Sequence, residues 1–415
     1  MEQVLIPQWS SKVLANLAQT LSLVCPSGRA SLLLASLLVA LVPITSQAED
    51  LRIGHLTLAD DPRYIRDWGY ARLIVPPQIQ TEQALAMAIE DLSFITEASG
   101  FAVVADHREV PESDLIATAQ AMVADGAGSI ILDLPAKDVE AVAMALGSSD
   151  VTLVNATAPE TDLRLACHPN LIHSGPSLRM EMDAFAQYLR AMNWTTVLVL
   201  VGEYPDDAGL AATFVTSAER LQLDIIETRP FTLSASPDQR EGNNVSLLTS
   251  GVDYDVVFVA DSRGEFGRFI PYGTQLPRPV IGSVGLTSEA WHWAMERDGA
   301  TQVTSRFDAA SDGRKMTSQD WSVWIAAKSL ITTAAKMPDA TVADRRDFMK
   351  SDRLKLDGSK GVTLNYRSWD GQLRMPMLLS TDDAVIAIAP IEGFLHALNT
   401  LDTLGTDQPE FACQQ

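Results

Sequence analysis

Polar and aromatic side chains follow four short apolar runs of this sequence, at the point where each run ends. Carboxylates beside aromatic rings suit a cation, an amine or a polyol, and carboxylates can also hold a metal ion. Hydroxyl and amide groups add hydrogen-bond donors and acceptors for a small molecule. These candidate ligand-binding residues are Tyr64, Trp68, Asn155, Thr157, Tyr204, Asp206, Asp261 and Arg263.

Some of these positions also have a purely structural interpretation. Asp206 and Asp261 could instead cap the helices that follow them. The segment Asn155–Ala158 could be a plain turn at the end of a strand. At these positions the sequence leaves both interpretations open.

The sequence carries no strong catalytic signature. It has no G-x-S-x-G, no G-x-x-x-x-G-K-[ST], no H-E-x-x-H and no G-x-G-x-x-G after a strand. His168 and His173 are five residues apart near an extended turn, which is not the spacing of two ligands on one helix. We therefore predict a protein that is not an enzyme and has no cofactor or catalytic metal.

The elements that would position the candidate residues alternate between strand and helix. Apolar runs such as Leu51–Leu58 and Ser129–Leu134 are typical of buried strands, and stretches such as Thr81–Ser99 have helical spacing. A second such series is expected to open with Leu171–Ser174, and later come a helix at Thr287–Arg297 and a strand at Gln302–Arg306. The pattern predicts an α/β fold with doubly wound parallel sheets, in which ligands bind beyond the carboxyl ends of strands.

The N-terminus has the pattern of a secretory signal peptide, residues 1–48. Lys12 and Arg29 precede an uncharged run, Ser31–Thr45, and small residues follow up to Ala48. The uncharged run of about 15 residues is short for a membrane-spanning helix, which needs about 20. We expect cleavage after Ala48 and export to the periplasm.

Two cysteines remain after the predicted cleavage site, Cys167 and Cys413. In an oxidising compartment two cysteines favour one disulfide, although two unpaired buried thiols would also fit. The bridge would close a loop of about 245 residues and stabilise the fold by about 3–5 kcal/mol.

The composition excludes other classes of protein. The formal net charge is −22 and no basic run occurs, which argues against a nucleic-acid partner. Because 47% of the residues are hydrophobic and 20% are charged, the chain can form a large core. An acidic surface favours a soluble monomer.

Five segments spread over the chain carry a family resemblance. They are Cys167–Ser177 (CHPNLIHSGPS), Pro277–Leu286 (PRPVIGSVGL), Trp291–Trp293 with Gly299–Gln302, Ser368–Arg374 (SWDGQLR) and Leu401–Gly405 (LDTLG). With them the chain resembles type I periplasmic binding proteins, the branched-chain amino acid-binding class of ABC importers. It is most similar to the subgroup associated with pyrroloquinoline-quinone (PQQ)-dependent alcohol oxidation.

The resemblance implies two lobes joined by three crossovers, with the ligand between the lobes. The crossovers would fall near Leu171–Ser174, Ser283–Leu286 and Met375–Ser380. Residues 49–172 and 286–376 would form lobe 1, and residues 173–285 and 377–415 would form lobe 2. The implied partners are a small-molecule ligand and the ABC permease subunits of the inner membrane.

The chain departs from the amino-acid-binding pattern after its third strand. Relatives of that class usually present Ser and Thr after the third and fourth strands, where they hold the carboxylate and ammonium groups of the ligand. Here Leu134-Pro135-Ala136 offers no hydroxyl, and its proline has no N–H. Tyr204 and Asp261 lie where relatives have a cleft tyrosine and an acid near the ammonium group. The departure argues against a standard amino acid as ligand.

Three functions are compatible with these features. The first is the periplasmic substrate-binding component of an ABC transporter linked to PQQ-dependent alcohol oxidation. Its ligand would be an alcohol-derived solute, a cofactor-related compound or a metal complex. The second is a ligand sensor of the same fold that signals to a membrane partner, and the third is a secreted enzyme of unrecognised type.

Overall fold

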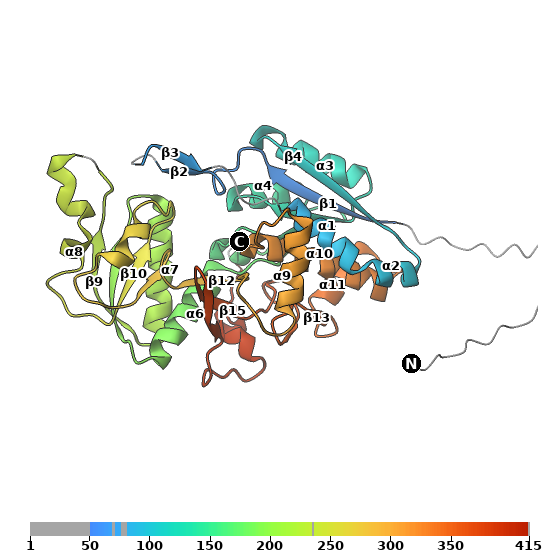
Figure 1. Ribbon diagram of the computed structural model, residues 1–415. Coiled ribbons are helices and arrows are strands. Elements are labelled where there is room, and N and C mark those ends of the chain that lie inside the picture. The colour runs from blue at the N-terminus through green and yellow to red at the C-terminus, as the bar shows by residue number, and fades with distance from the viewer. Residues whose placement is uncertain (1–49, 69–70, 76–80, 235, 414–415) are drawn as a thin grey trace, which may run out of the picture. The chain divides into compact units, whose positions relative to one another are not determined.

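The structure, a computed structural model, describes residues 50–68, 71–75, 81–234 and 236–413 (Figure 1). The predicted signal peptide, residues 1–48, lies outside these described residues. Within them, parallel strands alternate with helices in two separate sheets. The predicted α/β class with doubly wound parallel sheets is confirmed.

The first sheet has five parallel strands in the order β4-β1-β5-β6-β7. They are β1 (Leu51–Leu58), β4 (Val103–Val110), β5 (Ser129–Asp133), β6 (Thr152–Asn155) and β7 (Leu171–His173). The middle of each inner strand is buried because helices cover both faces of the sheet. Leu171–Ser174, expected to open the second series, instead supplies the edge strand of this first sheet.

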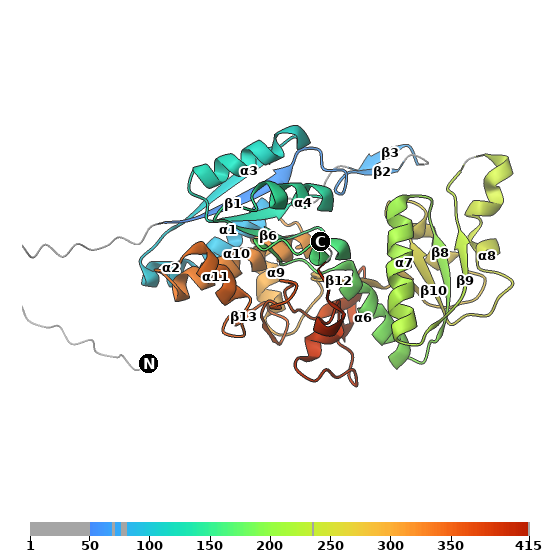
Figure 2. The ribbon, with the colours of Figure 1, turned by 180° about the vertical axis from the view of Figure 1, so that it is seen from behind.

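Helices from two distant parts of the chain cover this sheet (Figures 1 and 2). They are α1 (Glu82–Asp91), α2 (Ser93–Ser99), α3 (Leu115–Ala124), α4 (Ala136–Ala145), α5 (Thr161–Leu165), α10 (Ser318–Lys336) and α11 (Val342–Met349). Ile130 and Leu132 of β5 belong to the core under α3 and α4, whereas Ile131 faces the core that contains α1 and α10. Trp324 Nε1 of α10 donates to Asp91 Oδ2 at 2.9 Å, which joins the late helix to the early one.

The second sheet has four parallel strands in the order β11-β10-β8-β9. They are β8 (Thr196–Val201), β9 (Asp224–Pro230), β10 (Val256–Ala260) and β11 (Val280–Gly282). The helices α6 (Leu178–Ala191), α7 (Pro205–Arg220) and α8 (Val245–Leu248) flank it. Phe214 of α7 stacks on Phe258 of β10, with the ring centroids 3.9 Å apart.

A small antiparallel sheet, in the order β12-β15-β16, packs against α6. Its strands are β12 (Thr287–Glu289), β15 (Met377–Thr381) and β16 (Ala384–Ala389). Two short pairs complete the strands: β2 (Arg66–Trp68) with β3 (Leu73–Val75), and β13 (Leu356–Asp357) with β14 (Thr363–Leu364). Short 3-10 segments lie at residues 112–114, 237–243, 267–272, 400–403 and 408–410.

Two predicted elements are wrong. The helix expected at Thr287–Arg297 is strand β12 followed by a loop, and the strand expected at Gln302–Arg306 lies inside α9 (Ala300–Ala310). Gly299, in a left-handed conformation with φ 83°, caps the start of α9. Ala300, Val303 and Phe307 are buried at helical spacing. The predicted strand Gln302–Arg306 is too short to contain this spacing.

Two local features fix the path of the chain between these elements. Cys167 and Cys413 form the predicted disulfide, with their Cα atoms 5.5 Å apart. Gly282, at the end of β11, has φ +111°, and a Cβ atom there would lie 2.3 Å from the carbonyl oxygen of Val259. No other residue type fits this backbone position without displacing β10.

Candidate ligand-binding site

The strand order of the first sheet reverses at β1, and a pocket lies beyond the carboxyl end of the strands at that point. β4 is on one side of β1 and β5 is on the other, which is the place where open parallel sheets hold ligands. The pocket has a volume of about 350 Å³, and Thr57, Tyr64 and Asp133 are among its lining residues.

Asp133, the last residue of β5, is the centre of this part of the site. Its Oδ1 accepts hydrogen bonds from Thr157 Oγ1 at 2.7 Å, from Arg63 Nη2 at 3.1 Å and from the hydroxyl of Tyr64. Its Oδ2 accepts one from Thr81 Oγ1 at 2.7 Å. The side chain is 3% exposed. The four donors occupy the acceptor capacity of this carboxylate.

Arg63 connects Asp133 to a second carboxylate, Asp61. Nη2 of Arg63 lies 2.6 Å from Asp61 Oδ2, and Nη1 donates to Thr157 Oγ1 at 3.0 Å. Burial by itself would raise the pKa of the Asp133 carboxyl, but Arg63 and the hydroxyl donors outweigh burial and hold that pKa below its ordinary value. Asp133 is therefore a carboxylate at neutral pH, and the cluster of two acids and one guanidinium carries a net negative charge.

A pair of histidines extends this network away from the pocket. His55 is fully buried, and its Nδ1 lies 3.0 Å from Nδ1 of His107 while its Nε2 lies 3.3 Å from Thr81 Oγ1. Burial lowers the pKa of His55 to about 4, so its ring is neutral at physiological pH. A chain of hydrogen-bonding groups thus runs from His107 through His55 and Thr81 to Asp133.

Asp261 follows β10 of the second sheet, but its carboxylate is used by its own loop. It accepts hydrogen bonds from the backbone N–H groups of Gly264 at 3.0 Å and Gly267 at 2.6 Å. Its backbone N–H donates to Ser283 Oγ at 2.9 Å. Burial raises the pKa of Asp261, although the two amide donors counteract part of that effect. Asp261 therefore shapes the wall of the site.

Tyr204 and Arg263 form a second contact at this edge. The guanidinium of Arg263 lies 4.8 Å from the centroid of the Tyr204 ring. Tyr204 begins α7, and its backbone N–H donates to Asp207 Oδ2 at 3.1 Å. Asp207, fully buried, also accepts from the N–H of Ser262 at 2.6 Å. Tyr204, Arg263 and Asp261 line one pocket of about 460 Å³.

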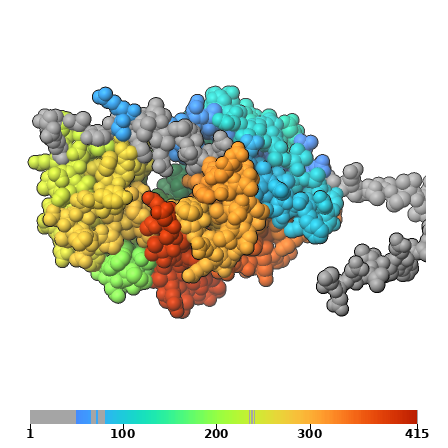
Figure 3. Space-filling view, viewed as in Figure 1, coloured from blue at the N-terminus to red at the C-terminus, as the bar shows by residue number. Residues whose placement is uncertain are grey.

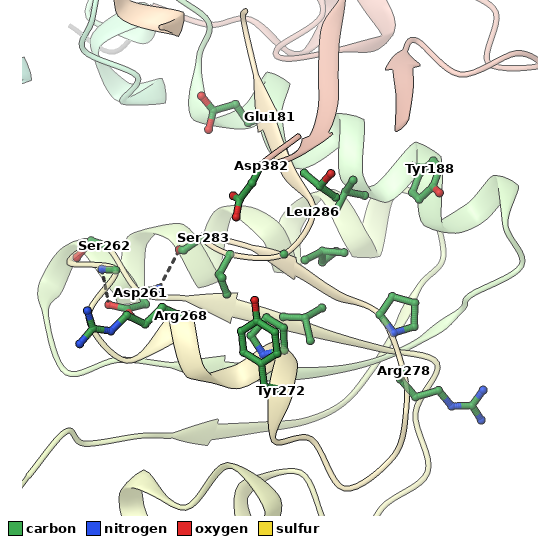
Figure 4. Close-up of a pocket in the computed structure, with 18 of the residues that line it drawn as sticks. Glu181, Tyr188, Asp261, Ser262, Arg268, Tyr272, Arg278, Ser283, Leu286 and Asp382 are labelled. Atoms are coloured by element: carbon green, nitrogen blue, oxygen red, sulfur yellow. Dashed lines mark hydrogen bonds between the residues drawn. The ribbon is translucent and has the colours of Figure 1, made fainter. Parts of the chain in front are cut away.

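Two larger pockets, of about 1130 and 660 Å³, meet at Glu181 of α6. Both are lined by Glu181, Gln319 and Asp382. Figure 4 shows the larger one, into which Glu181 and Asp382 project, with Asp261 and Ser283 joined by a hydrogen bond nearby. The surface is visibly hollowed beside the β15–β16 hairpin, which is red in Figure 3.

The structure brings five of the eight predicted residues into two groups. Tyr64 and Thr157 both bond to Asp133 at the edge of the first sheet, and both line the 660 Å³ pocket. Tyr204, Asp261 and Arg263 line a common pocket at the edge of the second sheet. The two groups come from the two sheets, as the positions after the strands predicted.

The other three predicted residues lie elsewhere. Asn155 is fully buried, and its side chain forms hydrogen bonds with Ala158 and His173. This agrees with the alternative interpretation of the segment as a turn. Asp206 is exposed in the first turn of α7, where Asp207 provides the capping carboxylate. Trp68 is the last residue of β2, and its side chain lies outside the described part of the structure.

Sequence reasoning missed three residues that the structure places in the site. Asp133 was available as a signal, because it is a charged residue at the end of an otherwise apolar strand. The residue after it, Leu134, is fully buried and does not reach the site. Arg63 and Glu181 gave no signal, since an arginine in a loop and a glutamate on an amphipathic helix are ordinary surface residues.

The described residues also bear on metal binding and on membrane insertion. No group of three or more His, Cys, Asp or Glu side chains among them is arranged to hold a metal ion. None of the helices they form is both long and apolar enough to cross a membrane.

Comparison with known proteins agrees with this geometry. The sequence profile of a family described as periplasmic binding protein matches residues 102–271. A branched-chain amino acid ABC transporter periplasmic ligand-binding protein from Burkholderia xenovorans superposes with a TM-score of 0.65 at 12% identity, over 82% of this chain and 95% of that one. No curated protein matched the sequence.

Two further solved structures have the same fold, and their names give different ligands. One is a solute-binding protein from Rhodopseudomonas palustris in complex with 3,4-dihydroxybenzoic acid, with a TM-score of 0.59, 13% identity, and coverage of 80% of this chain and 93% of that one. The other is a leucine-, isoleucine-, valine-, threonine- and alanine-binding protein from Brucella ovis, with a TM-score of 0.61, 15% identity, and coverage of 83% and 93%. The chain has the fold of type I periplasmic binding proteins, and its residues 102–271 match the periplasmic binding protein family.

Proposed function

We propose that this chain is the solute-binding component of an ABC importer, which captures a small molecule outside the cytoplasm and delivers it unchanged to a permease. The observation that carries this proposal is the pair of pockets that meet at Glu181. They are lined by Tyr64 and Thr157 from the edge of the first sheet and by Asp261 from the edge of the second. Ligands of open parallel sheets bind at such edges.

The proposed mechanism is closure of two lobes around the ligand. Lobe 1 would comprise residues 49–172 and 286–376, and lobe 2 would comprise residues 173–285 and 377–415. A ligand that binds the closed arrangement more tightly shifts the equilibrium toward it, and the permease would recognise that state. The order of strands and helices supports this division, because α10 and α11 return to the first sheet after the second sheet is complete.

The proposed location is the periplasm, reached through a cleaved signal peptide at residues 1–48, and the proposed state is a monomer. The disulfide between Cys167 and Cys413 supports an oxidising compartment, since such bonds persist outside the cytoplasm. The net charge of −22 supports a protein that does not associate with itself.

We further propose that the ligand is linked to PQQ-dependent alcohol oxidation. The five segments that resemble that subgroup, among them Cys167–Ser177 and Ser368–Arg374, support this link. The ligand would then be an alcohol-derived solute, a cofactor-related compound or a metal complex. The departure at Leu134-Pro135-Ala136 argues against a standard amino acid.

Ligand screening by thermal denaturation tests this proposal. Protein produced from the full-length sequence is melted with alcohols, aldehydes, acids, amines, PQQ and metal ions, each added separately. A ligand at a hundred times its Kd stabilises the folded state by about 2.7 kcal/mol and so raises Tm. If no class of small molecule raises Tm, the chain is not a solute receptor.

A further inference from the structure

We propose that the solute is an organic cation without a carboxylate, and that its charge lies against Glu181 where the two large pockets meet. This inference rests on the proposed function and narrows the ligand class. It is carried by the carboxylates of the 660 Å³ pocket, by the pairing of the two cations described in that pocket, and by the engagement of three hydroxyl donors at the edge of the first sheet.

Glu181 carries a carboxyl group that lines both large pockets and has no hydrogen-bond or salt-bridge partner among the described residues. It belongs to the first turn of α6. A partly buried carboxylate left in this way is costly unless another group supplies the opposite charge.

Two further carboxylates line the 660 Å³ pocket with Glu181: Glu289 of β12 and Asp382 of the β15–β16 turn. Glu289 accepts one hydrogen bond, from Thr287 Oγ1 at 2.7 Å. The carboxylate of Asp382 has no hydrogen-bond or salt-bridge partner among the described side chains. Because α6 packs against both β12 and β15, the three acids face one cavity from neighbouring elements.

The two cations described as lining the 660 Å³ pocket, Arg63 and Lys315, are paired with other groups, whereas Arg263, Arg268 and Arg278 line the larger pocket instead. Arg63 is bound by Asp61 and Asp133. Lys315 lies 2.9 Å from Asp308 Oδ2.

Arg164 is buried behind the site, and its guanidinium donates to five neutral oxygens, namely the carbonyls of Ala158, Glu160, Gly175 and Pro176 and the side-chain oxygen of Gln372. Arg63 and Lys315, which line the 660 Å³ pocket, are both held in ion pairs with aspartates. The acids Glu181, Glu289 and Asp382 therefore make this pocket electronegative.

The edge of the first sheet offers little to an incoming carboxylate. Thr81, Thr157 and Tyr64 already donate their hydroxyl hydrogens to Asp133. The negative charge of Asp133 at the same place would repel a second carboxylate. A carboxylate that binds at this edge would have to break these hydrogen bonds, whereas a cation there would not.

An aromatic ring completes the fit to a cation. Trp293 lines the 660 Å³ pocket and is 38% exposed. Lys315 Nζ lies 5.9 Å from the centroid of this ring, so its electron-rich face already attracts a cation. An ammonium group with alkyl substituents could contact the ring and Glu181 from within one cavity.

Protonation of Glu181 should couple to binding. Burial raises the pKa of its carboxyl to about 8, and the nearby Glu289 adds to that shift. Arg164 of α5 lowers the pKa of Glu181, and Glu160, which precedes α5, raises it. Asp382 in turn raises the pKa of Glu289. A bound cation would favour the ionised form, so binding of a permanent cation should strengthen as pH rises from 6 to 9.

The test uses the full-length chain and probes that differ in charge. Choline and (2-phenylethyl)trimethylammonium are permanent cations of two sizes. The alcohol 3,3-dimethylbutan-1-ol is the neutral isostere of choline, and glycine betaine adds a carboxylate. Calorimetric titration should give choline or its larger analogue at least tenfold tighter binding than the neutral alcohol, and betaine should bind more weakly than choline.

Two variants locate the charge. Glu181→Gln should lower cation affinity at least tenfold and remove its rise with pH, while Glu140→Gln, at an exposed position of α4, should leave both unchanged. Glu181→Asp keeps the charge and should retain part of the affinity. Equal binding of cation and neutral isostere, or an unaffected Glu181→Gln variant, would overturn this inference while leaving the receptor function intact. The receptor function itself fails only if the whole thermal screen is negative.

Discussion

Arg63 Nη2 donates to Oδ1 of Asp133 at 3.1 Å, although the two residues are 70 positions apart in the sequence. The contact joins the loop after β1 to the end of β5. The same nitrogen lies 2.6 Å from Oδ2 of Asp61, so one guanidinium forms ion pairs with two carboxylates. Both carboxylates are 3% exposed, which makes them costly to leave without this partner.

Replacing Arg63 with methionine should destabilise the fold by about 3 kcal/mol, because it leaves two buried carboxylates without a counter-charge. Arg108→Met is the matched control. Arg108 also pairs with two acids, Asp106 and Asp125, and its side chain is 28% exposed against 24% for Arg63, but its partners are 28% and 60% exposed. The control should cost less than about 1 kcal/mol in urea denaturation. Equal costs would show that burial of the acids does not matter.

Gly282→Ala should destabilise the protein by about 3 kcal/mol, since it combines a left-handed backbone with overpacking. The new Cβ would lie 2.3 Å from the carbonyl oxygen of Val259. Gly313→Ala isolates the backbone effect, because Gly313 has φ +88° and nothing lies within 4 Å of its Cβ position. That control should cost about 1 kcal/mol by chemical denaturation. A larger loss in the control than in Gly282→Ala would contradict the role of the close contact.

The stability of the unliganded protein should fall as pH rises from 6.5 to 8. The pKa of Glu181 is raised from 4.5 to about 8 in the folded state, so the folded chain binds more protons than the unfolded chain in that interval. The pKa of the buried His55 is lowered to about 4, so His55 makes stability rise with pH, but only below pH 6.5. In the Glu181→Gln variant, the free energy of unfolding should fall less between pH 6.5 and 8. Denaturation curves measured at pH 6.5, 7.25 and 8 check this. An unchanged slope would mean that Glu181 titrates normally.

Removing the disulfide should lower stability by about 2–5 kcal/mol, because Cys167 and Cys413 close a long loop. Cys413→Ser and reduction of the native protein should give the same loss in urea denaturation, and reducing agent should have no further effect on the variant. Thiol titration of the unreduced, unfolded protein provides the direct check. The titration should find neither Cys167 nor Cys413 free, and two free thiols from this pair would contradict the bridge.

The strands of both sheets could be predicted from the sequence because buried parallel strands are continuous apolar runs. β10 is an unbroken apolar run that is buried at every position, and β5 is apolar between Ser129 and Asp133. The region after β11 was harder, because short segments such as Gln302–Arg306 fit either periodicity. Its helical character depends on burial of Phe307 against distant elements, which the local sequence does not reveal.

Part of the site could also be predicted, for a similar reason. Tyr64 and Thr157 follow strands, and parallel strands bring their carboxyl ends to one edge. The pairing of Arg63 with Asp133 could not be predicted, because it requires the order of β1 and β5 in the sheet. The lack of a partner for Glu181 is likewise a property of the folded molecule, since it depends on which side chains approach α6.

The two aspartates at the sheet edges differ in the source of their donors, and this difference has an evolutionary consequence. Asp133 is held by side chains, so single substitutions at Tyr64, Thr81 or Thr157 can each free one of its acceptor sites. Asp261 is held by main-chain amides, which every residue except proline retains. The first sheet edge is therefore where descendants of this chain can acquire a new ligand by stepwise mutation, while the second edge is inherited with the path of its loop.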